Sequence, residues 1–216
     1  LGTKCGGCIT RHISYEAELK FKHQRVLDAV TRIGKIDASL VDKIVPSDNI
    51  NAYRNKSQLP IAYDNDGKVT VGFFAQRSHR VIPVNGCLLH SEAFNPIIDS
   101  FIDFANKYKL IPYDEKSHSG LLRHLYMRHA MGTDEIMVCI IINGSKLPHE
   151  TELCSILTAI DSRIKTIIIN ENREKTNVII GKKCRTIWGN GYITDKLCGL
   201  SFRISPLSFY QVNRSQ

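Results

Sequence analysis

Apolar residues at helical spacing predict three helices. They recur every three or four positions in residues 14–34, 92–108 and 149–163, which is the period of an α-helix with one buried face. The first segment opens at Ser14, a capping hydroxyl followed by two acidic residues, and closes at Gly34. Residues of these types favour the start and the stop of a helix. We therefore expect three helices, separated by segments of a different pattern.

Those other segments carry the pattern of β-strands. Residues 58–63 and 69–75 flank the sequence Asp-Asn-Asp-Gly at 64–67, which is typical of a tight hairpin turn. Further strands are predicted at 80–84, 120–130, 135–143, 166–170, 177–181, 183–188 and 200–204. The mixed order of helices and strands predicts an α+β fold, a mainly antiparallel sheet with helices packed on it.

Composition narrows the class of protein. The chain has 216 residues, of which 43% are hydrophobic and 23% charged, as in ordinary globular domains. No apolar run reaches the length that a membrane-spanning helix needs. Lys and Arg outnumber Asp and Glu by 29 to 21. Such a surplus makes a polyanion such as nucleic acid a plausible partner.

The cysteines raise the question of a metal or redox site. There are seven, an odd number at irregular spacing, which argues against a secreted disulfide framework and favours a reducing cytoplasm. Cys139 and Cys154 lie within apolar patterns, where we expect small core residues. Cys5 and Cys8 enclose two glycines, so their sulfurs can converge on one centre. Cys87 follows a glycine at the end of a predicted strand.

Three interpretations of Cys5 and Cys8 follow from the residues alone. The pair could bind iron or zinc, act as a redox couple, or be structural. A zinc site would require two more ligands, for which Cys184 and Cys198 are the candidates. A thioredoxin-like couple normally opens a helix after a strand, and no strand precedes this pair.

Several short motifs occur in a fixed order along the chain. Cys-Gly-Gly-Cys at 5–8 is followed by Tyr-Arg-Asn-Lys at 53–56, Gly-Phe at 72–73 and Arg-Ser-His at 77–79. Cys87 comes next, and the chain closes on Ile-Ser-Pro-Leu-Ser-Phe-Tyr-Gln-Val-Asn at 204–213. This ordered series closely resembles the bacterial uracil-C5 RNA methyltransferases and is most similar to their 23S rRNA branch.

The resemblance implies a division into domains. Members of the family carry an N-terminal oligonucleotide-binding barrel, a central α/β domain and a C-terminal Rossmann-like methyltransferase domain. Residues 1–204 resemble the central domain, which binds RNA and an iron–sulfur cluster, and residues 205–216 resemble the start of the catalytic one. In the family a cysteine thiolate adds to C6 of uracil, and C5 then attacks the methyl group of S-adenosylmethionine. The nucleophile and the base would lie beyond Gln216, so we expect residues 1–216 alone to be inactive.

The same resemblance assigns candidate ligands. Gln211 matches a contact to S-adenosylmethionine, for which an amide offers both a donor and an acceptor. Cys5, Cys8 and Cys87 match three of the four ligands of a [4Fe–4S] cluster. The remaining ligand would precede Leu1, and without it we expect the cluster to be held poorly.

RNA contacts are expected at basic and aromatic positions. Phe209 could stack on a base or be a core aromatic residue. Arg54 and Lys56 flank the start of a strand, and Arg77 and His79 lie in the loop after the hairpin, where side chains can reach phosphates. A weaker candidate set comprises Arg123, His124 and Arg128.

The favoured interpretation is thus a cytoplasmic protein that binds 23S rRNA, with no membrane and no obligate protein partner. The alternative is a stand-alone RNA-binding iron–sulfur module, or a zinc or redox module built on Cys5 and Cys8, without a catalytic role.

Overall fold

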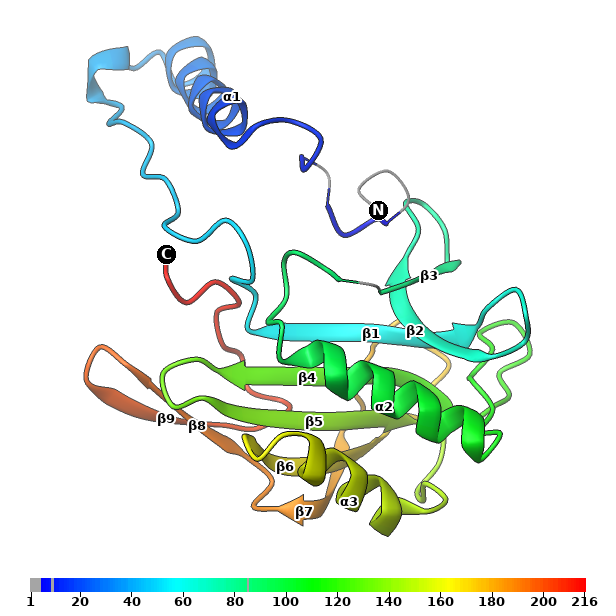
Figure 1. Cartoon of the computed structure of the whole chain (residues 1–216). Helices are drawn as coiled ribbons and strands as arrows, with labels where there is room; N and C mark the ends of the chain where they lie inside the picture. Colours follow the sequence, from blue (N-terminus) through cyan, green and yellow to red (C-terminus); the bar gives the residue numbers. More distant parts are fainter. Residues whose placement is uncertain (1–4, 9, 85) are drawn as a thin grey trace.

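One seven-stranded sheet organises the molecule (Figure 1). The computed structural model describes residues 5–8, 10–84 and 86–216. Its sheet has the order β3-β2-β1-β4-β5-β6-β7, and only β5 and β6 run parallel. The strands are β1 (Lys56–Tyr63), β2 (Val69–Phe74), β3 (Val81–Pro83), β4 (Leu122–Ala130), β5 (Glu135–Ile142), β6 (Ile164–Glu171) and β7 (Lys183–Gly189). The expected α+β class with a mostly antiparallel sheet is confirmed.

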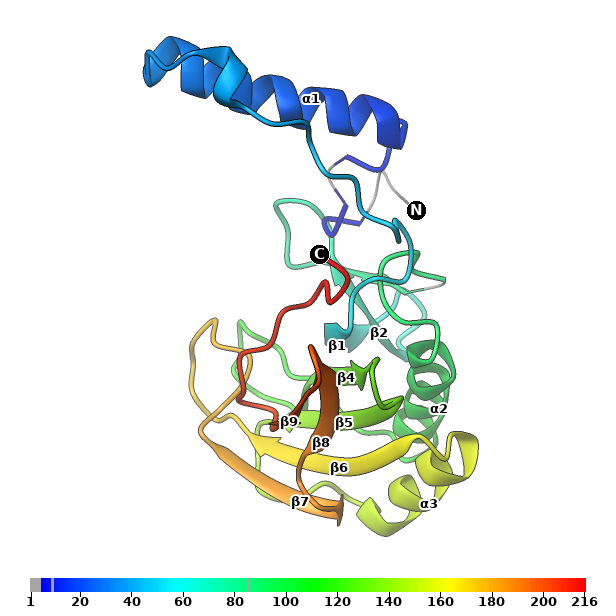
Figure 2. The same cartoon turned by 90° about the vertical axis from the view of Figure 1, so that its left-hand side faces the viewer.

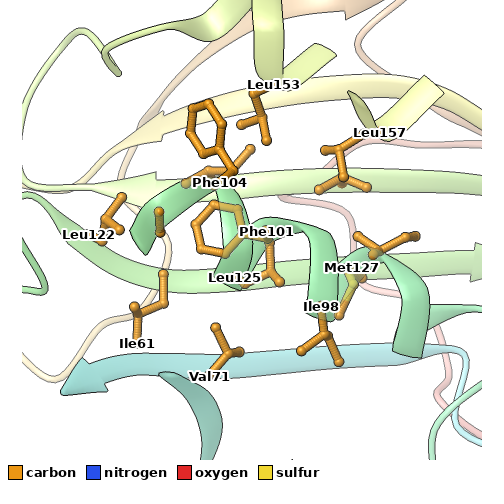
Figure 3. Close-up of a cluster of buried hydrophobic side chains, with 14 of the residues drawn as sticks. Ile61, Val71, Ile98, Phe101, Phe104, Leu122, Leu125, Met127, Leu153 and Leu157 are labelled. Carbon is orange, nitrogen blue, oxygen red and sulfur yellow. The ribbon is translucent and has the colours of Figure 1, made fainter. Parts of the chain in front are cut away.

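Two helices cover one face of this sheet. Helix α2 (Phe94–Lys107) and helix α3 (Glu150–Ile160) bury apolar side chains against the strands (Figure 3). Phe101 and Phe104 of α2 are at most 1% exposed and meet residues such as Leu125 of β4. Burying a phenylalanine side chain contributes roughly 1.5–3 kcal/mol relative to leaving it in water. This layer is therefore the principal core.

A second, smaller core lies on the opposite face. The hairpin of β8 (Ile193–Leu197) and β9 (Leu200–Ile204) packs there, with Ile193 and Ile204 against Tyr126 and Cys139. Successive residues of a strand point to opposite faces, so Tyr126 enters this core while its neighbours on β4 enter the first. The middle strands are therefore buried on both sides.

The predicted helices and most predicted strands are confirmed, with one error and one omission. Residues 177–181 form no strand. Their backbone is hydrogen-bonded by the side chains of Asn170 in β6 and of Asn172 just after it. Asn172 Nδ2 donates to the carbonyls of Val178 (2.6 Å) and Ile179 (3.0 Å), and Asn170 bonds Gly181. Strand β8 was not predicted. Cys139 and Cys154 are buried, as expected.

The N-terminal arm, residues 10–50, stands away from the sheet (Figure 2). Helix α1 (Tyr15–Asp28) begins at Ser14, whose hydroxyl accepts from Ala17 N–H, and it buries no residue. It continues through a π-helix (Ala29–Ile33) into an irregular link. No helix in the described ranges is long and apolar enough to cross a membrane.

The C-terminal tail, residues 205–216, contains no helix or strand. It passes over the side of β1 and β4 opposite α2 and ends near the arm (Figures 1 and 2). Asn213 forms an isolated bridge with Arg54, just before β1. The start of a second domain at residue 205 coincides with the end of β9 and stays a prediction.

Candidate functional site

The tail and the start of β1 enclose a pocket of about 600 Å³, here called the tail pocket. Its lining residues are Tyr53, Arg54, Lys56, Ser57, Gln58, Phe73, Gln211, Val212, Asn213 and Gln216. Three residues predicted from the sequence, Arg54, Lys56 and Gln211, therefore come together, although more than 150 positions separate the first two from the third.

The tail pocket is positively charged. Among the ion pairs of the described residues, none includes Arg54 or Lys56. Burial, and then the guanidinium of Arg128 on the neighbouring strand, lower the pKa of the Lys56 ammonium. Both effects reflect a cation with little water and no carboxylate beside it. An anion in this pocket would relieve that cost.

The tail is fixed to the sheet by buried polar side chains. Arg128 is 5% exposed and donates to the carbonyl of Ser208 and to the Tyr126 hydroxyl. The carboxylate of Asp195 is fully buried and accepts from the Tyr210 hydroxyl (2.9 Å) as well as from two backbone amides. Tyr210 therefore points inward.

The residues on either side of Tyr210 point outward. Phe209 is 86% exposed and Gln211 is also exposed. The interpretation of Phe209 as a core aromatic residue is therefore wrong. Because alternate residues of an extended segment share a side, Phe209 and Gln211 are presented together.

A second hollow, the cysteine pocket, adjoins the tail pocket through the shared wall of Phe73. It has a volume of about 450 Å³ and is lined by all three predicted ligands, Cys5, Cys8 and Cys87. Burial, and then the proximity of Cys87 and Cys5, raise the pKa of the Cys8 thiol. The Cys8 thiol therefore lies near both Cys87 and Cys5.

Two backbone amides bond the sulfurs of the cysteine pocket. The amide of Gly7 donates to Cys5 Sγ (3.4 Å) and that of Leu89 to Cys87 Sγ (3.5 Å); such bonds stabilise sulfur bound to iron. In the described part of the chain, no three His, Cys, Asp or Glu side chains are close enough for a single metal ion. Cys184 and Cys198 do not line the pocket, so they do not complete a zinc site with Cys5 and Cys8.

The other basic candidates lie elsewhere. Arg77 and His79 are exposed on the loop between β2 and β3, where His79 Nδ1 lies 2.7 Å from a carboxylate oxygen of Glu115. The prediction that Arg123, His124 and Arg128 contact RNA is wrong, because these side chains are at most 8% exposed. Arg123, for example, donates to the carbonyls of Asn172 and Glu174.

Comparison with known proteins bears on this site. Over 214 residues, the chain is 42% identical to an uncharacterised RNA methyltransferase of Clostridium tetani, covering 99% of this chain and 46% of that protein. Over 213 residues, it is 38% identical to one of Halalkalibacterium halodurans, covering 99% and 46%. Its homologues are RNA methyltransferases.

A solved structure shares the fold. The tRNA (uracil-54, C5)-methyltransferase of Pyrococcus abyssi, in complex with S-adenosyl-L-homocysteine, superposes with a TM-score of 0.76 at 27% identity. The match covers 98% of this chain and 48% of that one. The chain thus spans about half the length of the curated relatives and of the structure that it matches. No protein-family model matches it.

Sequence reasoning missed two residues that build the site, Asn55 and Asp195. Asn55 lies between Arg54 and Lys56, yet it is 3% exposed and bonds the tail. A short amide directly before a strand often bonds nearby backbone, but the sequence does not show that its partner is 156 residues away. Asp195 lies inside β8 and accepts from the backbone amide of Gly132, 63 positions away, a contact that the sequence likewise does not show.

Proposed function

We propose that this chain is the RNA-binding part of an S-adenosylmethionine-dependent RNA uracil-C5 methyltransferase that modifies 23S rRNA in the cytoplasm. The observation that carries the proposal is the tail pocket, where Gln211 meets two cations that have no ion-pair partner among the described residues. The RNA methyltransferase homologues and the fold of the Pyrococcus abyssi enzyme support it.

Three residues of the tail pocket, together with Phe209 of the neighbouring tail, then have roles. Arg54 and Lys56 bind phosphate groups of the RNA, for which unpaired cations are suited. Gln211 hydrogen-bonds polar groups of S-adenosylmethionine, the methyl donor, and Phe209 stacks on a base. Arg77 and His79 form a second contact to RNA on the β2–β3 loop. None of the seven cysteines acts as the nucleophile.

The cysteine pocket is proposed to hold a [4Fe–4S] cluster in a structural role. Cys5, Cys8 and Cys87 would be ligands of this cluster. The neighbouring amides of Gly7 and Leu89 stabilise the ligand sulfurs. The shared wall at Phe73 connects this site to the tail pocket.

The proposed activity can be tested by following C5 of uridine directly. The full-length protein is incubated with S-adenosylmethionine and with 23S rRNA or tRNA transcripts that carry tritium at C5 of uridine. Methylation at C5 must release that tritium. We expect release from 23S rRNA only, and none from residues 1–216 alone. Release from tRNA only would correct the substrate, and no release from either RNA would refute the activity.

The cluster is tested by anaerobic reconstitution of the full-length protein with iron and sulfide. A cysteine-bound cluster should give a broad absorption near roughly 400 nm. We expect Cys87→Ala to reduce cluster loading strongly, whereas Cys198→Ala, an exposed cysteine outside the pocket, should load normally. Equal loading of the two variants would remove Cys87 from the ligand set.

A further inference from the structure

The two walls of the tail pocket come from distant parts of the sequence and meet at one residue. The first wall contains Arg54 and Lys56 at the start of β1, and the second contains Gln211 and Val212 of the tail. Asn55 lies between Arg54 and Lys56 in the sequence and so belongs to the first wall. Its side-chain Nδ2 donates to the carbonyl of Gln211 (2.8 Å), and its backbone amide donates to the carbonyl of Val212 (3.0 Å).

Asn55 is itself firmly held. It is 3% exposed, and its carbonyl accepts from the backbone amide of His129 (2.8 Å), which ties it to the end of β4. The tail around Gln211 has no helix or strand of its own. Fixing the carbonyl of Gln211 therefore restricts the backbone on which the Gln211 side chain is mounted.

We infer that Asn55 is a positioning residue for the proposed cofactor and RNA site. Its amide holds the backbone of Gln211 at a set distance from Arg54 and Lys56, so that the Gln211 side chain faces the pocket. This inference rests on the proposed function and deepens it, because it explains how residues that bind two different ligands keep one geometry.

The chain offers a matched control for this role. Asn172 is 2% exposed, and its Nδ2 donates to the carbonyls of Val178 and Ile179 in another irregular segment. It does not line the tail pocket. Asn55→Ala and Asn172→Ala thus remove the same kind of buried side-chain bond, one at the pocket and one away from it. Asn172 Oδ1 also accepts from the backbone amide of Glu174, so Asn172→Ala removes more bonds and should lower stability at least as much as Asn55→Ala.

The test compares these variants in the full-length protein. Loss of one hydrogen bond weakens an interaction about twofold to tenfold. We expect Asn55→Ala to weaken S-adenosylmethionine binding by about that factor and to speed hydrogen exchange in the peptide covering residues 208–213. Asn172→Ala should change neither, and should speed exchange only around residues 176–181.

A second variant covers the case in which Asn55→Ala does not fold. Asn55→Asp has the same shape but replaces the donor with an oxygen that faces the Gln211 carbonyl, so it should loosen the same peptide. Unchanged exchange at 208–213 in the folded Asn55 variants, or equal loss of cofactor binding in Asn172→Ala, would overturn the inference. If the unsubstituted protein binds no S-adenosylmethionine, the proposed function fails, while exchange at 208–213 still tests the anchoring by Asn55.

Discussion

Helices α1 and α2 are both 14 residues long, yet α2 buries six side chains and α1 buries none. Each contains phenylalanine: Phe101 of α2 is fully buried, whereas Phe21 of α1 is 51% exposed. Helix α2 completes the core of the sheet. Helix α1 projects from the end of the molecule where the C-terminal tail ends (Figures 1 and 2).

The difference separates a closed region from an open one. In the closed region, apolar side chains pack against one another and most buried polar groups are bonded within the chain. In the open region, Arg54 and Lys56 have no ion-pair partner among the described residues, and Phe209 and Gln211 are exposed. Changes in the closed region should therefore affect folding, and changes in the open region should affect binding.

The largest expected effect is in the closed region. Phe101→Ala should lower the free energy of unfolding by about 3–5 kcal/mol, because the surrounding core cannot fill the cavity. Urea denaturation monitored by circular dichroism measures this change. A loss below about 1 kcal/mol would show that the α2 layer is not the principal core.

Lowering the pH should also reduce the free energy of unfolding through a group in the closed region. Burial, and then Arg123, lower the pKa of His124 to about 4. Because the folded state resists protonation that the unfolded state accepts near pH 6.5, stability is highest above that pH. It should fall by up to about 3 kcal/mol as the pH drops to about 4.

Variants identify the group responsible for this acid sensitivity. In His124→Gln the free energy of unfolding should depend much less on pH between 6.5 and 4. His12→Gln, which replaces an exposed histidine of the arm, should retain the full dependence. The same pH dependence in both variants would exclude His124 as the cause.

Intermediate effects are expected in binding rather than in folding. In the full-length protein, Phe209→Ala should weaken RNA binding by the roughly 1–3 kcal/mol that stacking contributes. Gln211→Ala should weaken S-adenosylmethionine binding by about 0.5–1.5 kcal/mol. Both residues are exposed, so the denaturation midpoint should not change. If both variants lose the same ligand equally, these residues do not divide the two roles.

The smallest effect is expected for Phe21→Ala, the counterpart of Phe101→Ala in the open region. Because Phe21 is 51% exposed, the free energy of unfolding of residues 1–216 should change by less than about 0.5 kcal/mol. A loss comparable to that of Phe101→Ala would contradict the distinction between the two helices.

The closed region could largely be predicted from the sequence. Helical and strand periodicity identified α2, β4 and β5 because their burial follows a local pattern. The segment 177–181 misled the same reasoning, since Asn170 and Asn172 satisfy its backbone in place of a strand partner. The spacing of apolar residues carries no information about such side-chain-to-backbone hydrogen bonds.

The open region could be predicted only in part. Motifs identified Arg54, Lys56 and Gln211, and the structure brings them to one pocket. The residue that joins them, Asn55, has its partner 156 positions away. No local pattern encodes that contact, because it depends on how the β8–β9 hairpin returns the tail to the sheet.

The most direct test of the proposed function is the amount of 5-methyluridine in cellular RNA. Ribosomal and transfer RNA from the source organism, with and without the gene, are digested to nucleosides and quantified by mass spectrometry. Deletion should remove 5-methyluridine from 23S rRNA, leave it in tRNA, and be reversed by the unsubstituted gene. Unchanged 5-methyluridine in both RNA classes after deletion would contradict the assignment of this chain to a uracil-C5 RNA methyltransferase.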